Sequence, residues 1–342
     1  MTHVPIHTSW PTEPLGRIEN ILTDGCGSVE AWDFSLANTS YESRVHFVSK
    51  IASVCYQSPK ALGSISLFDR LQAEAAGLPS SSYEMCPILL TKEQFAAKDL
   101  KACWKFGEQV GDYLLTNLRA LIADVGPEES LNYLNTTPEE IQIIKDNFKV
   151  FLFNVDLATR AQMVRHRCSW QELSRRYVSG KKQPFEFYIS EKMKGVISEH
   201  FDDGSNFFFD TKDIVRICLE HYDEAIAAGV KPEEARRILP QAMKTTIWGA
   251  FQPAQLANFF ALRLHKTAQR EIQQTAQAMK ELKDFCGENN TLCSWAKDDI
   301  AELIINSNYH RYKDIDWINK YLDIQEYCTK VLAHKKSLSL KN

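Results

Sequence analysis

Residues 150–155 read VFLFNV, and residues 162–177 read QMVRHRCSWQELSRRY. The first segment has the clearest strand pattern of the chain, and a helical pattern leads from it into the second. The second segment holds four arginines, a histidine, a glutamate and two serines within sixteen residues. Polar segments that leave a buried strand commonly form ligand sites, and arginine binds phosphate or carboxylate groups through two parallel hydrogen bonds. We therefore predict an anion-binding site here, although a solvated basic turn or a nucleic-acid surface would give a similar pattern.

The whole chain has the composition of an ordinary folded protein. Of its 342 residues, 44% are hydrophobic and 25% are charged, and 40 basic against 44 acidic side chains give a net charge of −4. This balance excludes a disordered or collagen-like chain and makes nucleic acid an unexpected partner. No apolar run is long enough for a membrane span, and the N-terminus lacks the pattern of a signal peptide. The nine cysteines include no Cys-x-x-Cys pair, which predicts reduced thiols, no metal site and a cytoplasmic protein.

Helical patterns outnumber strand patterns along the rest of the chain. Residues 1–40 are expected to form an irregular lead-in, residues 91–146 are expected to be helical, and residues 185–189 give a second strand pattern. Further helices are expected at residues 41–57, 66–77, 212–228, 254–285 and 297–307. A few strands among many helices favour an α+β fold over a doubly wound parallel sheet.

The expected helix at 254–285 places a charged side chain on an apolar face. At about 100° per residue, Arg263 lies on the same side as Leu256 and Phe260. A buried guanidinium without a partner is costly, so Arg263 is expected to meet an anion. That anion is either a ligand or a carboxylate of the protein itself. Asn258 lies on the neighbouring flank, where a packing role and a ligand contact are both open.

A third polar segment reads ARRILP over residues 235–240. The adjacent Arg236 and Arg237 point in different directions on a helix, so one can face a ligand while the other is solvated. Taken alone, this segment is a weak signal.

Together these segments resemble the flavin-dependent thymidylate synthase (ThyX) family. The family pattern Gln-x-x-Arg-His-Arg, followed by Ser-x-Arg-Tyr, is matched within residues 162–177. The likeness continues in the strand pattern at 185–189 and in Ala-Arg-x-x-Leu-Pro at 235–240. It ends with Asn-Phe-x-x-Leu-Arg and Ala-Gln-x-Glu-Ile at 258–272.

The resemblance implies a central, mostly antiparallel sheet with packed helices. It implies one catalytic domain over residues 1–342, with core motifs at 149–283. Residues 91–146 would then be a helical insertion and residues 287–342 a helical C-terminal extension. The implied activity is the methylation of dUMP at C5 to dTMP, with FAD as cofactor, NADPH as reductant and methylenetetrahydrofolate as one-carbon donor. A homotetramer with active sites shared between subunits is also implied.

The resemblance assigns roles to individual residues. Arg263 would be catalytic, because it would favour loss of the N3 proton of dUMP and so make C5 nucleophilic. The residues implied to bind dUMP are Gln162, Arg165, Glu172, Leu173, Ser174, Arg175, Arg176, Arg236 and Arg263. The residues implied to bind FAD are Arg165, His166, Arg167, Glu172, Gln252 and Asn258.

The chain departs from the family pattern at several positions. Six residues separate Arg167 from Ser174, one fewer than in the family. Met85 stands where the family has a histidine, and Gln252 stands where many members have asparagine; Ala254 and Thr267 also differ. Two alternatives therefore stay open. The protein could alkylate C5 of another pyrimidine nucleotide, or it could be a non-catalytic homologue that binds nucleotides or nucleic acid.

Overall fold

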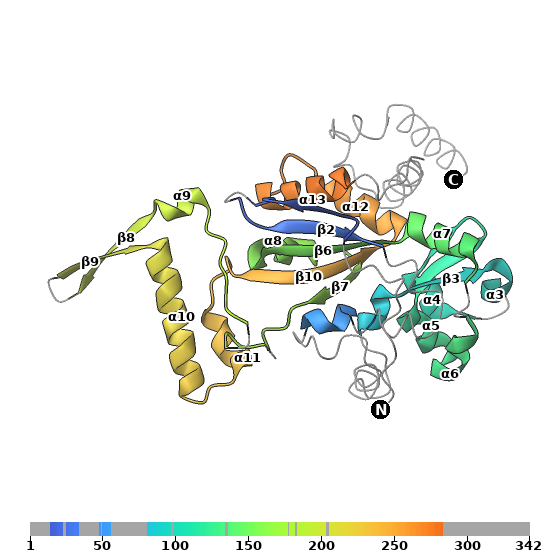
Figure 1. Ribbon diagram of the computed structural model, residues 1–342, viewed down its shortest axis with the longest axis horizontal. Coiled ribbons are helices and arrows are strands. Elements are labelled where there is room, and N and C mark those ends of the chain that lie inside the picture. Colours follow the sequence, from blue (N-terminus) through green and yellow to red (C-terminus); the bar gives the residue numbers. More distant parts are fainter. Residues whose placement is uncertain are drawn as a thin grey trace, which may run out of the picture.

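The computed structural model is shown in Figure 1. It describes residues 14–22, 25–33, 48, 50–55, 81–96, 99–133, 136–176, 178–181, 183–202 and 205–282. Outside these residues lie the expected helices at 66–77 and 297–307, the expected C-terminal extension at 287–342, most of the expected helix at 41–57, and Tyr177.

A five-stranded antiparallel sheet forms the centre of the molecule. Its spatial order is β1 (Gly16–Glu19), β2 (Ser28–Trp32), β6 (Lys149–Asp156), β10 (Lys244–Phe251) and β7 (Ser169–Glu172). The α+β fold with a mostly antiparallel sheet is thereby confirmed. The predicted strand at 150–155 is the middle strand, and the middle of the polar segment, residues 169–172, forms the edge strand β7.

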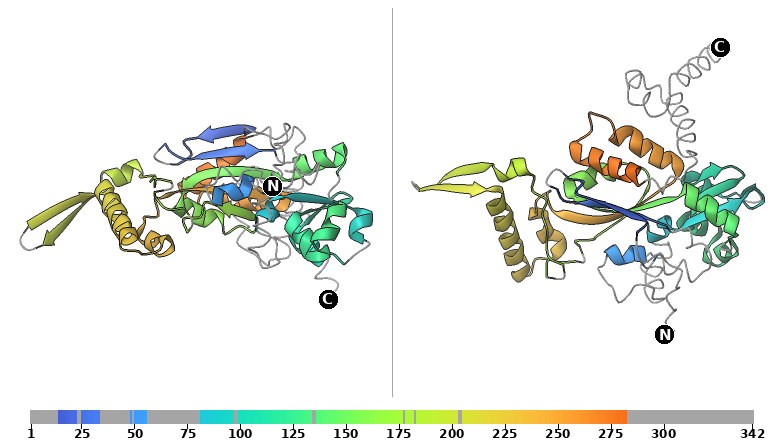
Figure 2. Two further views of the ribbon diagram at one scale, coloured as in Figure 1. Left: turned by 60° about the horizontal axis from the view of Figure 1, so that its bottom comes forward. Right: turned by 45° about the horizontal axis from the view of Figure 1, so that its top comes forward.

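The middle strand β6 serves two hydrophobic cores, because successive side chains of a strand point to opposite faces. Val150 belongs to a core shared with residues 83–121, which we call the insertion-side core. Phe151, Phe153 and Val155 belong to a second core, the helix-side core. The helices that close this second core are α8 (Leu157–Met163), α12 (Pro253–Arg263) and α13 (Arg270–Glu281). In Figure 2, α12 and α13 lie together against one side of the sheet.

The expectation of an irregular lead-in at residues 1–40 is wrong where the structure describes it, because β1 and β2 pair there as a hairpin. These strands have only four and five residues, too short to give a periodic signal. The turn between them depends on positive φ angles, 59° at Asn20 and 79° at Gly27. A Cβ at Gly27 would also lie 2.8 Å from Leu22, so only glycine fits this close approach.

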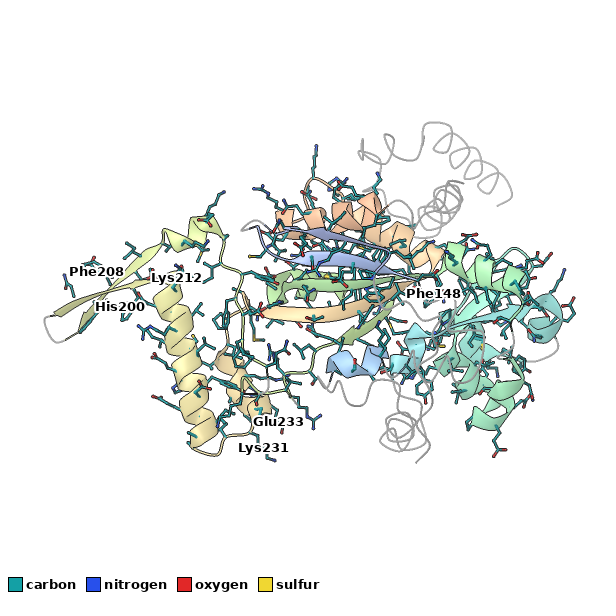
Figure 3. All side chains as sticks on the ribbon, in the orientation of Figure 1. Phe148, His200, Phe208, Lys212, Lys231 and Glu233 are labelled. Atoms are coloured by element: carbon teal, nitrogen blue, oxygen red, sulfur yellow. The ribbon has the colours of Figure 1, made fainter. Side chains whose placement is uncertain are left out.

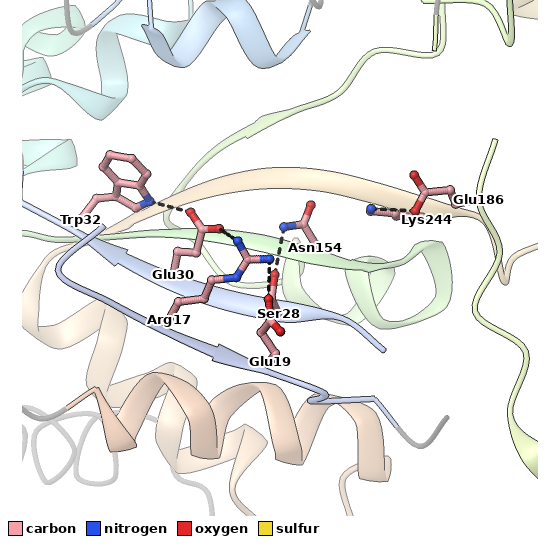
Figure 4. A network of polar contacts seen from close by, with 8 residues as sticks. All are labelled: Arg17, Glu19, Ser28, Glu30, Trp32, Asn154, Glu186 and Lys244. Atoms are coloured by element: carbon pink, nitrogen blue, oxygen red, sulfur yellow. Dashed lines mark hydrogen bonds and ion pairs between the residues drawn. The ribbon is translucent and has the colours of Figure 1, made fainter. Parts of the chain in front are cut away.

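A polar network links the two strands of this hairpin, and Asn154 of β6 donates to the Ser28 hydroxyl at 3.0 Å (Figure 4). Glu30 is buried, and it accepts a hydrogen bond of 3.1 Å from the Trp32 indole. Its second oxygen lies 3.1 Å from Arg17, and that arginine also pairs with Glu19 at 2.8 Å. Because a buried carboxylate requires partners of this kind, the network accounts for a charged residue in a fully buried strand.

The insertion, residues 91–146, packs at one end of the sheet (Figure 1). Its helices are α3 (Lys92–Ala96), α4 (Lys101–Phe106), α5 (Leu118–Val125), α6 (Pro127–Ser130), η4 (Leu131–Tyr133) and α7 (Pro138–Asn147). Contrary to the helical expectation, β4 (Glu108–Val110) and β5 (Tyr113–Asn117) form a hairpin within it. Gly111, with φ 59°, begins its two-residue turn, and such a short hairpin leaves little trace in hydrophobic periodicity. Before the insertion come η3 (Ser81–Met85) and β3 (Pro87–Thr91), which pairs with β5.

An arm projects from the opposite end of the molecule in Figures 1 and 2. It consists of the hairpin β8 (Ile197–Asp202) and β9 (Ser205–Asp210) with the helix α10 (Thr211–Ala227), which confirms the helix expected at 212–228. The elements beside it are α9 (Glu191–Lys194), α11 (Pro232–Ala235) and η5 (Arg236–Ile238). The strand expected at 185–189 is reduced to one bridge between Phe187 and Met243.

The single helix expected at 254–285 is two helices, α12 and α13. The chain turns between them, where the Ala268 amide donates to the His265 carbonyl at 2.9 Å. The His265 ring also contacts the Thr267 hydroxyl at 2.6 Å. These local hydrogen bonds compete with helical ones and break the helix. The hydrophobic periodicity of the sequence continues through this break.

Candidate functional site

A cluster centred on Arg263 brings together the ends of α8 and α12. The side chain of Asp156 caps the start of α8, and after this helix the His166 amide donates to the Met163 carbonyl at 3.1 Å. This turn places the His166 ring under α12, 4.6 Å from the ring of Phe259. Arg263, the last residue of α12, donates from Nε to His166 Nε2 at 2.7 Å, and from Nη2 to the carbonyl of Gln162 at 2.9 Å.

The charge of Arg263 has no anionic partner among the residues that the structure describes, because both of its hydrogen bonds go to neutral groups. Burial lowers the pKa of its guanidinium, and the nearby charge of Arg165 lowers it further. The sequence left open a salt bridge between Arg263 and a carboxylate of the protein. No such salt bridge is present within the described part of the chain. A half-buried cation held by neutral acceptors favours the binding of an external anion.

His166 is neutral in this cluster. Burial, and then the charge of Arg263, lowers its pKa from 6.5 to about 4. Its Nε2 accepts the bond from Arg263, so its Nδ1 carries the proton, and Nδ1 is buried without a hydrogen-bond partner. A buried donor of this kind is unusual, and it leaves one hydrogen-bonding position of the cluster open.

Glu172 is fixed by a second pair of contacts on the sheet. Its Oε2 accepts from Nε of Arg160 at 2.7 Å and also pairs with the Nη2 of the same arginine. Its Oε1 accepts from the hydroxyl of Thr245 at 2.9 Å. Both carboxylate oxygens are therefore held by neighbouring elements. Sequence reasoning missed Arg160, because its partner is 12 residues away and on a different element.

The chain continues past Glu172 along the sheet. The Leu173 amide donates to the Thr246 carbonyl at 2.9 Å, and the Ser174 amide donates to the Cys55 carbonyl at 3.2 Å. Leu173 is buried, and Ser174 is half-buried where the chain leaves β7. The backbone at this point is thus fixed by neighbouring elements.

The remaining arginines of the motif point in different directions. Arg175 is buried, donates to the Gln183 carbonyl at 3.0 Å and lies 4.6 Å from the ring of Phe185. Arg176 is exposed and pairs with Glu233 at 2.9 Å. Arg236 is exposed on η5. The structure therefore brings Gln162, His166 and Arg263 together and leaves Arg175, Arg176 and Arg236 outside that cluster.

Two of the six residues assigned to FAD border a pair of neighbouring cavities. The first, of about 430 Å³, is lined in part by Arg167 and Gln252. The second, of about 340 Å³, shares both residues. Gln252 is buried and donates to the Phe106 carbonyl at 2.9 Å. Arg165 and Arg167 are exposed, and Asn258 is half-buried on α12.

The described residues contain neither a membrane-spanning helix nor a cluster of metal ligands. No helix there has the length and apolarity to cross a bilayer. No group of three or more histidine, cysteine, aspartate or glutamate side chains is placed there to hold a metal ion.

Comparison with known proteins places the similarity in the second half of the chain. Residues 145–286 match the family model of the thymidylate synthase complementing proteins. A flavin-dependent thymidylate synthase of Aquifex aeolicus is 33% identical over 150 residues, which are 41% of this chain and 47% of that protein. One of Pyrococcus furiosus is 32% identical over 151 residues, 43% of this chain and 59% of that protein. The resemblance inferred from the motifs is thereby confirmed for this region.

The chain spans only about half the length of these curated relatives. Among solved structures, a UMP/dUMP methylase of Streptomyces cacaoi bound with 5-Br dUMP is 21% identical, with a TM-score of 0.32. That comparison covers 50% of this chain and 87% of the other.

Proposed function

We propose that the protein is a flavin-dependent thymidylate synthase that methylates C5 of dUMP. The observation that carries this proposal is the half-buried Arg263, whose charge meets, among the described residues, only the neutral His166 and a backbone carbonyl. Loss of the N3 proton puts a negative charge on the uracil ring, and a nearby guanidinium stabilises that charge. The anionic ring has its nucleophilic carbon at C5. His166, kept neutral by its lowered pKa, orients the guanidinium without adding a competing charge.

The other nucleotide contacts follow the family pattern. The hydroxyl of Ser174 would hold the phosphate group of dUMP, together with Arg176 and Arg236. The Gln162 side chain hydrogen-bonds Gln269 at 2.5 Å and would position the base. Glu172 would lie between nucleotide and flavin, and its two held oxygens support a fixed position there.

The residues near the two cavities fit a flavin. Arg167 and Gln252 offer a cation and an amide beside a cavity of about 430 Å³. This volume is within the usual range of ligand pockets. We propose that Arg165, His166, Arg167, Glu172, Gln252 and Asn258 hold FAD. FAD, when bound, supplies the redox chemistry, with NADPH as reductant and methylenetetrahydrofolate as the one-carbon donor.

We also propose a homotetramer with shared sites. Among the described residues, Arg236 lies on η5 outside the Arg263 cluster, so a complete nucleotide site requires a second source of contacts. The arm supports assembly, because an isolated two-stranded hairpin is marginally stable in water. The adjacent residues Phe207 and Phe208 of β9 are both exposed, and successive side chains of a strand point to opposite faces. Phe208 is labelled in Figure 3. A second copy of the chain would cover such apolar surface.

A single catalytic domain in the cytoplasm completes the proposal. The insertion and the sheet share one core, which supports one domain rather than two. The thiols of Cys55, Cys103, Cys168 and Cys218 are free, which suits a reducing compartment.

The test is tritium release from C5-tritiated dUMP at low oxygen, with FAD, NADPH and methylenetetrahydrofolate. We expect release that needs all of them and dTMP as product. Arg263→Gln should lower the rate at least tenfold, since it removes a charge-assisted hydrogen bond. Arg216→Gln is the matched control, because Arg216 pairs with Asp213 and Glu220 on the surface of α10.

Unchanged activity in Arg263→Gln would refute the assigned role. Release from dCMP but not from dUMP would favour a different pyrimidine nucleotide as substrate. A colourless protein that FAD cannot reconstitute would favour a non-catalytic homologue.

A further inference from the structure

The larger cavity lies between the insertion and the polar motif, and both contribute to its wall. Arg167, Cys168 and Ser169 come from the motif, and Gln252 and Gln255 come from the start of α12. The opposite wall comes from η3, α4, the end of β5 and α5. Its residues include Glu84, Ala102, Phe106, Asn117, Arg119 and Ala120. The insertion is therefore part of the site region rather than a separate surface decoration.

Hydrogen bonds fix this wall in place. The Phe106 carbonyl accepts from the Gln252 side chain at 2.9 Å. Both carboxylate oxygens of Glu108 accept from the Ala254 amide at 3.2 Å, so the insertion caps the start of α12. On the motif side, the hydroxyl of Ser169 donates to the Glu84 carbonyl at 3.2 Å. The cavity is thus enclosed by contacts that join three separate parts of the chain.

The side chains of the cavity combine aromatic surface with an excess of positive charge. Phe106 is 51% exposed, and it lines both this cavity and its smaller neighbour. Phe148, labelled in Figure 3, lines the cavity where the insertion joins the sheet. Arg119 pairs with Glu84, which leaves the positive charge of Arg167 uncompensated within the described residues. The exposed aromatic residue Phe106 favours a flat ligand, and the cations favour an acidic group.

We propose that this cavity is a ligand compartment in which Phe106 and Arg119 of the insertion determine binding. Its ligand is a planar fused-ring heteroaromatic compound that carries an acidic group. Phe106 contacts the ring, and Arg119 and Arg167 bind the acidic group. A flavin nucleotide and a folate share this chemistry, and naming these two candidates rests on the proposed function. The cavity and its wall do not depend on that function.

The test is a set of binding titrations with the full chain. Flavin fluorescence follows FAD, and calorimetry follows 5-formyltetrahydrofolate and dUMP. The variants to be tested are Arg119→Gln and Phe106→Ala. The matched controls are Arg216→Gln, on the distant α10, and Trp104→Ala. Trp104 is an exposed aromatic residue on the same helix as Phe106, packs on Phe95 at 5.4 Å and is not among the cavity-lining residues.

Arg119→Gln should weaken one of the two ring ligands about tenfold or more, because it loses a charge-assisted hydrogen bond. Phe106→Ala should weaken the same ligand, and both controls should leave it unchanged. The affinity for dUMP should stay within about twofold in every variant. Weaker FAD binding alone identifies the flavin as the occupant, and weaker folate binding alone identifies the folate.

Unaltered binding of both ring ligands in the two cavity variants would overturn the proposal, as would a wild-type protein that binds neither. Removal of Arg119 leaves Glu84 unpaired, so the double variant Glu84→Gln, Arg119→Gln checks that a loss of binding does not come from misfolding. Tritium release separates the two proposals. If the wild type releases no tritium but the cavity variants lose ligand, the proposed function fails and the compartment stands.

Discussion

The buried His166 makes the stability of the protein depend on pH, and this dependence can be measured without any ligand. The pKa of His166 is lowered from 6.5 to about 4, first by burial and second by the charge of Arg263. The folded state therefore disfavours protonation of the ring. The unfolded chain takes up a proton below pH 6.5, so acid favours unfolding.

The size of the effect follows from the two pKa values. The stability contributed by the neutral ring is fully present above pH 6.5 and is lost as the pH falls toward about 4. The difference between these two pKa values corresponds to about 3 kcal/mol of the free energy of unfolding. Below pH 4 the ring is protonated in both states, and its contribution no longer changes.

The assay is urea denaturation of the ligand-free protein at several pH values between 7.5 and 4. We expect the free energy of unfolding of His166→Gln to change with pH by about 3 kcal/mol less than that of the wild type over this range. His221→Gln is the matched control, because His221 is an exposed histidine on α10. The ring pKa measured directly by NMR should rise in Arg263→Gln. It should stay below 6.5, because burial is the larger cause.

A His166 that titrates near 6.5 in the wild type would refute the reasoning. So would an unchanged ring pKa in Arg263→Gln, because it would show that the two side chains do not interact in solution.

Three further substitutions test other parts of the structure. Gly249→Ala should lower the free energy of unfolding by about 1–3 kcal/mol in urea melts, because its Cβ would lie 2.6 Å from the Trp170 ring. Arg160→Gln should destabilise the fold by about 1–3 kcal/mol and raise the KM for dUMP, because it frees one oxygen of Glu172. Arg160→Lys should restore only part of the lost stability and only part of the lower KM. Thr137→Ala should cost about 1 kcal/mol and speed hydrogen exchange in α7, since it removes a capping box; unchanged exchange would contradict this.

The features that sequence reasoning found are those with strong local patterns. The strand at 150–155 is apolar enough to mark the centre of the sheet, and the long amphipathic pattern at 212–228 marks α10. The place of Arg263 was also readable, because a charge inside an apolar helical face is a local anomaly. The sequence left open whether this charge meets a protein carboxylate or a ligand. The neutral partners of Arg263 in the structure favour the ligand.

The features that were missed depend on contacts distant in sequence. β1 and β2 are too short for periodicity, and they exist because β2 pairs with β6 across more than a hundred residues. Arg160 reads as an ordinary helical residue until Glu172 is brought beside it. Phe106 and Arg119 lie in a segment without family motifs, so nothing in the sequence links them to Arg167. The cavity that joins them exists only in the folded chain.

Because β6 contributes Val150 to the insertion-side core and Phe151 to the helix-side core, neither core can open without exposing the strand that supports the other. The described part of the chain should therefore behave as one cooperative unit. The insertion would not melt first and leave the polar motif intact. In native-state hydrogen exchange, the slowest amides of β5 and of β10 should open with the same free energy, although the two strands belong to different sheets.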